Sequence, residues 1–116
     1  MNGLIALDQL YFPQEAIHWP EHWWVLNDDK DQDFRMRMQH LLNGELSEQH
    51  PLWGLQPVVL AKDDDDLVVH LNDGRYAVVH IVGSGKIDQY PTRFPSCYIF
   101  GNVTELQQWL EDPFGS

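Results

Sequence analysis

The chain has 116 residues, 18 of them acidic against seven basic, which gives a formal net charge of −11. This charge repels phosphate backbones and anionic lipid surfaces, so we expect neither nucleic acid nor membrane as a partner. No apolar stretch approaches the roughly 18 residues that a membrane-spanning helix needs. The length suits one domain, residues 1–116, and the 43% of hydrophobic residues can fill one core.

Cysteine usage indicates a reducing compartment. Cys97 is the only cysteine, whereas small secreted proteins usually carry several paired ones. The first basic residue is Lys30, so the N-terminus lacks the positive charge of a secretory signal. We therefore expect a cytoplasmic protein.

The N-terminal third, residues 1–29, is acidic and aromatic. It holds five carboxylates, three tryptophans and no lysine or arginine. Pro13 and Pro20 leave room only for short helices or strands. The remaining segment, residues 30–116, is expected to hold a helix, a hairpin-based sheet and a C-terminal helix.

A helix is expected directly after this segment, capped by Asp31 or Asp33. Its apolar positions follow the spacing of one buried stripe: Phe34, Met38, Leu41 and Leu42. Asn43-Gly44 is a natural C-terminal stop, although residues 45–48 could extend the helix by a turn.

Two strand regions follow the helix. Residues 57–61 predict a short buried strand, and the acidic run 63–66 predicts a turn. Residues 67–82 predict a β-hairpin, because two β-branched runs are joined by Asp73-Gly74. A two-residue type I′ turn would set a register that places His70 and His80 on opposite faces.

The last elements are a strand over residues 97–100 and a helix that Asn102 caps, with Glu105 three residues later. The helix has one apolar face, made of Val103, Leu106, Trp109 and Leu110. The expected fold is α+β: a small antiparallel sheet of three or four strands, with the hairpin at about 67–82 in its centre, packed with two or three helices.

The six histidines do not predict a metal site. His18 and His22 have the spacing of zinc ligands on a helix, but Pro20 lies between them and no third ligand is indicated. His70 and His80, on opposite faces in the expected register, could not share an ion. The acidic run 63–66 lacks the alternating spacing of a calcium loop. We expect no metal and no cofactor.

No catalytic set is indicated either. Cys97 lies in an apolar run, where burial favours the neutral thiol. Gly83 to Lys86 lacks the spacing of a phosphate-binding loop, and no Gly-x-Ser-x-Gly nucleophile motif is present. We therefore expect a protein that is not an enzyme.

The acidic and aromatic residues instead predict a protein-binding surface. Tryptophan anchors interfaces, and a carboxylate rim speeds association with a basic partner. The candidate residues are Trp19, Glu21, Trp23, Trp24, Asp28, Asp29, Asp31, Asp63, Asp64, Asp65 and Asp66. The competing interpretation is that the tryptophans pack on the sheet and the carboxylates only maintain solubility.

Residues 73–80, the proline-rich turn before residues 98–100, and the closing helix around Glu105, Leu106 and Trp109 resemble small bacterial proteins. Some of these are similar to immunity proteins encoded beside polymorphic, contact-dependent or type VI secreted toxins. The resemblance covers roughly residues 58–112. It implies a cytoplasmic antidote that binds a cognate toxin domain, often a basic nuclease, and blocks its active site or substrate access.

Two alternatives stay open. A small metal-dependent hydrolase would use some of the six histidines. An accessory subunit of a larger complex would use the same surface for assembly. The oligomeric state does not follow from the sequence.

Overall fold

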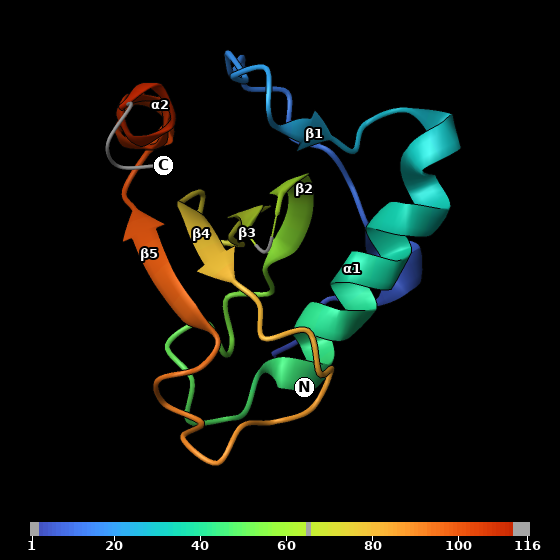
Figure 1. The fold of residues 1–116 in the computed structure, drawn as a ribbon, viewed down its shortest axis with the longest axis vertical. Helices are drawn as coiled ribbons and strands as arrows, with labels where there is room; N and C mark the ends of the chain where they lie inside the picture. The colour runs from blue at the N-terminus through green and yellow to red at the C-terminus, as the bar shows by residue number, and fades with distance from the viewer. Residues whose placement is uncertain (1–2, 65, 113–116) are drawn as a thin grey trace.

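The computed structural model describes residues 3–64 and 66–112, and Asp65 of the predicted acidic turn lies outside them. The described chain contains one antiparallel sheet in the order β1-β2-β3-β4-β5 (Figure 1). Its strands are β1 (Trp24–Val25), β2 (Val58–Asp63), β3 (Asp66–His70), β4 (Tyr76–His80) and β5 (Ser96–Phe100). The helices are α1 (Gln32–Glu45) and α2 (Val103–Glu111), with short 3-10 turns η1 (Leu7–Gln9) and η2 (Asp29–Asp31).

The α+β class is confirmed, with five strands in place of the expected three or four. The extra strand is the two-residue β1, which pairs only with Ala61 and Lys62 of β2. Such a short strand exists because β2 offers it backbone partners, so its own sequence pattern did not predict it. Neither described helix has the length and apolar content needed to cross a membrane.

The sheet is covered on both faces, because alternate strand residues pack in opposite directions. The α1-face cluster includes Met38, Leu42, Val69 and Val79. The α2-face cluster includes Leu106, Leu110, Val68 and Val78. The two helices therefore lie on opposite sides of the sheet (Figure 1). Burying each of these aliphatic side chains contributes about 1.5–3 kcal/mol.

Five residues, 71–75, lie between β3 and β4, and the turn itself is formed by three of them, residues 72–74, so the predicted two-residue turn is wrong. The Leu71 N–H donates to the Arg75 carbonyl at 2.8 Å, and the Gly74 N–H donates to the Leu71 carbonyl at 3.0 Å. Gly74 has φ of 91°, the left-handed conformation that closes a turn of this length.

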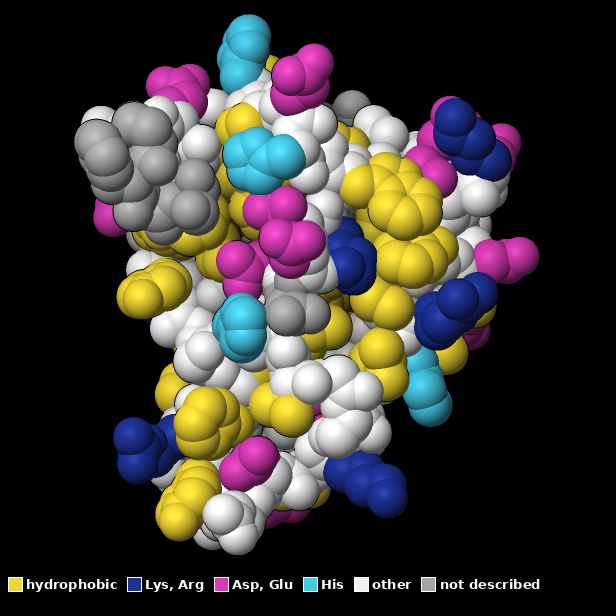
Figure 2. All heavy atoms as spheres, in the orientation of Figure 1, with side chains coloured by type: hydrophobic (Ala, Val, Ile, Leu, Met, Phe, Trp, Pro, Cys, Tyr) yellow, Lys and Arg dark blue, Asp and Glu magenta, His cyan; other side chains and the backbone are white. Residues whose placement is uncertain are grey.

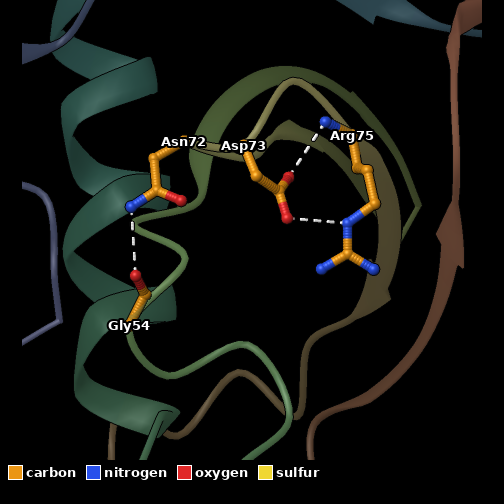
Figure 3. A network of polar contacts seen from close by, with 4 residues as sticks. All are labelled: Gly54, Asn72, Asp73 and Arg75. Carbon is orange, nitrogen blue, oxygen red and sulfur yellow. Dashed lines mark hydrogen bonds and ion pairs between the residues drawn. The ribbon is translucent and has the colours of Figure 1, made fainter.

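Polar contacts hold this loop in place (Figure 3). The Asp73 carboxylate accepts hydrogen bonds from the Arg75 backbone N–H at 3.1 Å and from Arg75 Nε at 2.8 Å. These bonds lower the pKa of Asp73. Asn72 Nδ2 donates to the Gly54 carbonyl at 3.0 Å and ties the hairpin tip to the preceding loop.

The longer loop moves the strand register by one residue. His70 pairs with Tyr76, and His80 lies four residues further along β4. His70 and His80 consequently lie on the same face of the sheet, and the prediction of opposite faces is corrected. Each has its own neighbour: His70 Nδ1 lies 2.6 Å from Tyr11 Oη, and His80 Nδ1 lies 2.9 Å from Asp66 Oδ1.

Helix α1 continues past the predicted stop at Asn43-Gly44 and ends at Glu45. Asn43 Nδ2 donates to the Ile5 carbonyl at 2.9 Å. A Cβ atom on Gly44 would lie 2.2 Å from the Gly85 carbonyl oxygen. Asn43 and Gly44 therefore make contacts with distant segments of the chain. They resemble a helix stop only when the local sequence is considered alone.

Polar side chains of α1 close the outer edge of β2. Gln39 is fully buried; its Nε2 donates to the Pro57 carbonyl at 2.8 Å and its Oε1 accepts from the Val59 N–H at 2.9 Å. Arg35, 3% exposed, donates from Nε to the Val59 carbonyl at 2.8 Å. Burial lowers the pKa of Arg35. These side chains provide the hydrogen bonds that a neighbouring strand would otherwise supply.

Helix α2 begins as predicted. The Asn102 side chain accepts the Glu105 N–H at 2.9 Å. The expected apolar face packs on the sheet, with Leu106 and Leu110 buried and Trp109 partly buried. The helix cap and the α2-face core are therefore both confirmed.

Candidate protein-binding surface

An exposed aromatic stack lies at the β1 edge of the sheet. Trp24 is 47% exposed, and its ring lies on that of Phe34 from α1 with centroids 4.4 Å apart and an interplanar angle of 21°. Trp24 pairs with Lys62 in β2, which positions the backbone of Trp24 against the sheet. A large aromatic surface held rigid before binding loses little conformational entropy when a partner covers it.

The buried Asp31 forms a hydrogen bond with the indole of this stack. The residue is 6% exposed and occupies the N-terminal cap position of α1, but its carboxylate makes no cap hydrogen bond. Its Oδ1 accepts the Trp24 indole N–H at 3.2 Å. The buried carboxylate therefore orients Trp24 and is itself withdrawn from solvent.

The β2–β3 turn carries carboxylates that follow Lys62, the strand partner of Trp24. Asp63 Oδ2 lies 3.5 Å from His22 Nε2, and Asp64 is exposed with φ of 47°. Burial raises the pKa of Asp63, the His22 side chain opposes this shift, and the carboxylates of Asp64 and Asp66 raise the pKa further. The acidic cluster is therefore only partly neutralised by its neighbours.

Two further exposed carboxylates, Asp28 and Asp29, lie just before α1. Figure 2 shows one face of the molecule, where hydrophobic side chains form a patch between carboxylates over the β2–β3 turn and carboxylates near the start of α1. We call one set of residues the acidic surface. It consists of the exposed Glu21, Trp24, Asp28, Asp29 and Asp64 and the half-buried Asp63 and Asp66.

The remaining predicted surface residues have other positions. Trp23 is 6% exposed and belongs to the α2-face cluster, where its ring lies 6.3 Å from that of Trp109. Trp19 is half-buried, 6.2 Å from Trp23. Burial removes Trp23 and Asp31 from the area that a partner would contact, so they support the acidic surface without forming it.

Sequence reasoning missed three contributors to this area. Phe34 was assigned to the buried helix stripe, yet it is only half-buried and carries the Trp24 ring. Lys62 carries no signal of such a role in the sequence; its Nζ donates to the Asp64 carbonyl. His22 stands out in the sequence only as a possible metal ligand. The alternation of Trp23 and Trp24 could have separated the core ring from the exposed one, had a strand been expected there.

Both ring nitrogens of the buried His50 form hydrogen bonds within the fold. Its Nδ1 accepts the Leu52 N–H at 3.1 Å, so the ring proton resides on Nε2, which donates to the Pro95 carbonyl at 2.7 Å. Burial lowers the pKa of His50, and the Pro95 carbonyl only partly opposes this shift. A neutral ring with both nitrogens occupied is not available to activate a nucleophile.

Cys97 shares a hollow of about 400 Å³ with His50. Burial raises the pKa of its thiol, which favours the unreactive neutral form. Another hollow of about 710 Å³ includes Leu4, Asn43 and Gln56 in its wall and has no titratable side chain there. Neither hollow brings together a nucleophile and a free base.

Tyr76 is a fully buried polar residue of the α2-face cluster, and its hydroxyl has no hydrogen-bond partner among the described residues. Burial, followed by the nearby Glu15 carboxylate, strongly raises the pKa of this phenol. The ring of His70 packs edge-on against it at 5.0 Å. Since solvent does not reach the hydroxyl, Tyr76 contributes to the core and not to surface chemistry.

Within residues 3–64 and 66–112, no group of three or more His, Cys, Asp or Glu side chains is arranged to hold a metal ion. Comparisons with protein-family models, with curated proteins and with solved structures found no match.

Proposed function

We propose that the chain is a cytoplasmic, non-enzymatic protein that binds and neutralises a basic partner, most specifically a cognate toxin domain. The observation that carries the proposal is the Trp24–Phe34 stack, in which Trp24 is 47% exposed and its indole N–H is bound to Asp31, in a chain with net charge −11. Aromatic anchors within a polar rim are typical of protein-binding sites.

The two components have different roles in binding. Exposed carboxylates accelerate the encounter with a positively charged partner, an effect that salt weakens. The indole of Trp24 is covered only after contact, so it determines how slowly the complex dissociates. Occlusion of a basic active site by this surface would neutralise a nuclease without any chemical step.

The experiment measures association of the purified chain with the product of the adjacent gene, which the proposal expects to be the toxin. Charge reversal to lysine at Asp28, Asp29 and Asp64 should lower the association rate by about tenfold or more at low salt. The control reverses the same number of exposed carboxylates elsewhere: Glu48, Glu111 and Asp112. Equal losses from both sets would show that net charge alone acts, and the absence of any binding would refute the proposal.

Replacement of Trp24, the proposed anchor, tests the contribution of the aromatic side chain separately from that of the carboxylates. Trp24→Ala should raise the dissociation rate by about 30-fold, the effect of losing a hot spot of about 2 kcal/mol, with little change in the association rate. The control is Met36→Ala, which truncates an exposed apolar residue of α1. Unchanged dissociation in the Trp24 variant would contradict the assignment of Trp24 as the anchor.

A further inference from the structure

The opposite edge of the sheet, β5, has no cover among the described elements (Figure 1). Its sequence, Ser-Cys-Tyr-Ile-Phe, contains no charged residue and no proline. Tyr98 is 67% exposed and Ile99 is 37% exposed. Edge strands that avoid pairing with other chains usually carry lysine, proline or a bulge, and β5 carries none of them.

The register shows which backbone groups of β5 are open. Hydrogen-bonded and non-hydrogen-bonded pairs alternate along an antiparallel ladder. The bond from the Leu71 N–H to the Arg75 carbonyl sets this alternation in β3–β4, so Tyr76 and Val78 direct their backbone groups toward β5. Continuing the alternation across the β4–β5 register directs the N–H and C=O groups of Cys97 and Ile99 away from the sheet.

Nothing in the described chain satisfies these groups, since no hydrogen bond to the backbone of Cys97 or Ile99 occurs beyond the sheet ladder. The ladder also has a natural end. Pro95 has no N–H, and its carbonyl already accepts a hydrogen bond from His50. The open edge therefore presents two residues, each with one donor and one acceptor.

Charge distinguishes this region from the rest of the molecule. Residues 81–100 contain two basic residues and one acidic residue, whereas the rest of the chain contains five basic and 17 acidic residues. Five of the eight exposed large hydrophobic side chains among the described residues also lie here: Val82, Ile87, Tyr90, Tyr98 and Ile99. Figure 2 shows hydrophobic side chains with few carboxylates over the β5 side of the molecule.

We propose that β5 pairs antiparallel with β5 of a second copy of the chain and forms a continuous ten-stranded sheet across a two-fold axis. The register places Cys97 opposite Ile99 of the other copy, twice, and satisfies all four open donors and acceptors with four hydrogen bonds. Tyr98 then faces its own counterpart in a non-hydrogen-bonded pair, where the side chains are closest.

A second copy fits this edge better than a basic partner does. The β5 region carries a slight positive charge, so it gives no attraction to a basic protein, and it is the part of this acidic chain where two copies repel each other least. The proposal does not depend on the proposed function, because the acidic surface lies at the β1 edge, on the other side of the sheet.

Sedimentation equilibrium of the full chain from micromolar to submillimolar concentration tests the proposal. We expect reversible association to twice the 13.6 kDa chain mass. Tyr98→Lys should shift the protein to a monomer, since two like charges then oppose each other across the axis. Tyr90→Lys introduces the same charge at a loop residue that is 52% exposed and should leave the dimer intact. Circular dichroism checks that both variants fold.

Cross-linking tests the register directly. In a Cys97→Ser background, Tyr98→Cys should form an intermolecular disulfide rapidly under mild oxidation. The Cα atoms of the two copies would lie about 4.5 Å apart, within the range that a disulfide spans. Tyr90→Cys in the same background is the control and should cross-link slowly.

Three results would overturn the proposal: a wild-type chain that is monomeric throughout, a dimer that survives Tyr98→Lys, or equal cross-linking of the two cysteine variants. A monomer whose Cys97 and Ile99 amides become protected only when a different protein binds would likewise overturn the assignment to a second copy.

Discussion

The two edges of the sheet differ in whether their outward-facing backbone groups have hydrogen-bond partners. At the β1 edge, side chains of α1 satisfy the outer backbone groups of β2, and the exposed Trp24 donates its indole N–H to Asp31. At the β5 edge, the backbone groups of Cys97 and Ile99 stay open, and the strand exposes the side chains of Tyr98 and Ile99.

This difference indicates which kind of partner each edge can accept. A strand cannot be added where glutamine and arginine side chains already occupy the ladder, so binding at the β1 edge depends on side chains and charge. Binding at the β5 edge depends on backbone hydrogen bonds, which a strand of any sequence could supply. Under the two proposals, charge favours a second copy at β5 and a basic protein at the acidic surface.

The largest effect is expected on the free energy of unfolding, when the two adjacent tryptophans of the β1 edge are replaced one at a time. Trp23→Ala should reduce the free energy of unfolding by about 3–5 kcal/mol, because it empties a core position. Trp24→Ala should cost about 1 kcal/mol, since it removes one exposed aromatic contact. Urea unfolding followed by circular dichroism measures both. Similar losses would show that Trp24 is a core residue and not part of a binding surface.

The next effect concerns the closure of β2. Gln39→Met keeps the side-chain length but leaves the Pro57 carbonyl and the Val59 N–H without partners. We expect a loss of about 2–4 kcal/mol, because each buried unsatisfied group costs about 1–3 kcal/mol. Gln49→Met is the same substitution at an exposed position and should change stability by less than about 0.5 kcal/mol. Equal effects would mean that Gln39 does not close the edge.

A smaller, pH-dependent effect is expected beside β5. The pKa of His50 lies below its ordinary value of 6.5, and burial is the main cause. The unfolded chain therefore binds a proton near pH 6.5 that the folded chain does not bind. Stability is fully present above that pH and should fall as the pH decreases, by at most about 1.4 kcal/mol per pH unit for this group.

Proton NMR of the His50 ring, together with unfolding curves between about pH 7.5 and about pH 5, measures this effect. The burial-lowered pKa of His70 acts in the same direction. A His50 ring that becomes protonated above pH 6.5 in the folded protein would contradict the assigned hydrogen bonds.

The smallest effect is expected at the open edge. Tyr98→Ser should change the stability of the dilute, monomeric protein by less than about 0.5 kcal/mol, because the side chain is 67% exposed. The same substitution should weaken self-association, which light scattering at high concentration measures. A large loss of monomer stability would show that Tyr98 packs within its own chain.

Much of the fold follows from local sequence signals. Asn102 and Glu105 mark the start of α2, and the β-branched runs mark a hairpin, because capping groups and strand periodicity act over a few residues. The hairpin register did not follow, since Asp73-Gly74 suits both a two-residue turn and the end of a three-residue loop. Asn72 at the hairpin tip bonds to Gly54, which is 18 residues away in sequence, so no local sequence signal indicates this contact.

The candidate site was less predictable than the fold. Composition located the acidic and aromatic segments, but it could not separate the buried Trp23 and Asp31 from the exposed Trp24. That separation depends on β1, which exists only because β2 lies beside it. The buried Arg35 and Gln39 of α1 also escaped prediction, because polar residues on a helix usually indicate its solvent face.

Residue-resolved amide hydrogen exchange at two protein concentrations tests the contrast between the edges most directly. The account predicts that the Val59 amide, bonded to Gln39, is protected at both concentrations. The Cys97 and Ile99 amides should exchange rapidly in dilute protein and become protected in concentrated protein. Protection of Cys97 and Ile99 that does not change with concentration, or rapid exchange at Val59, would contradict it.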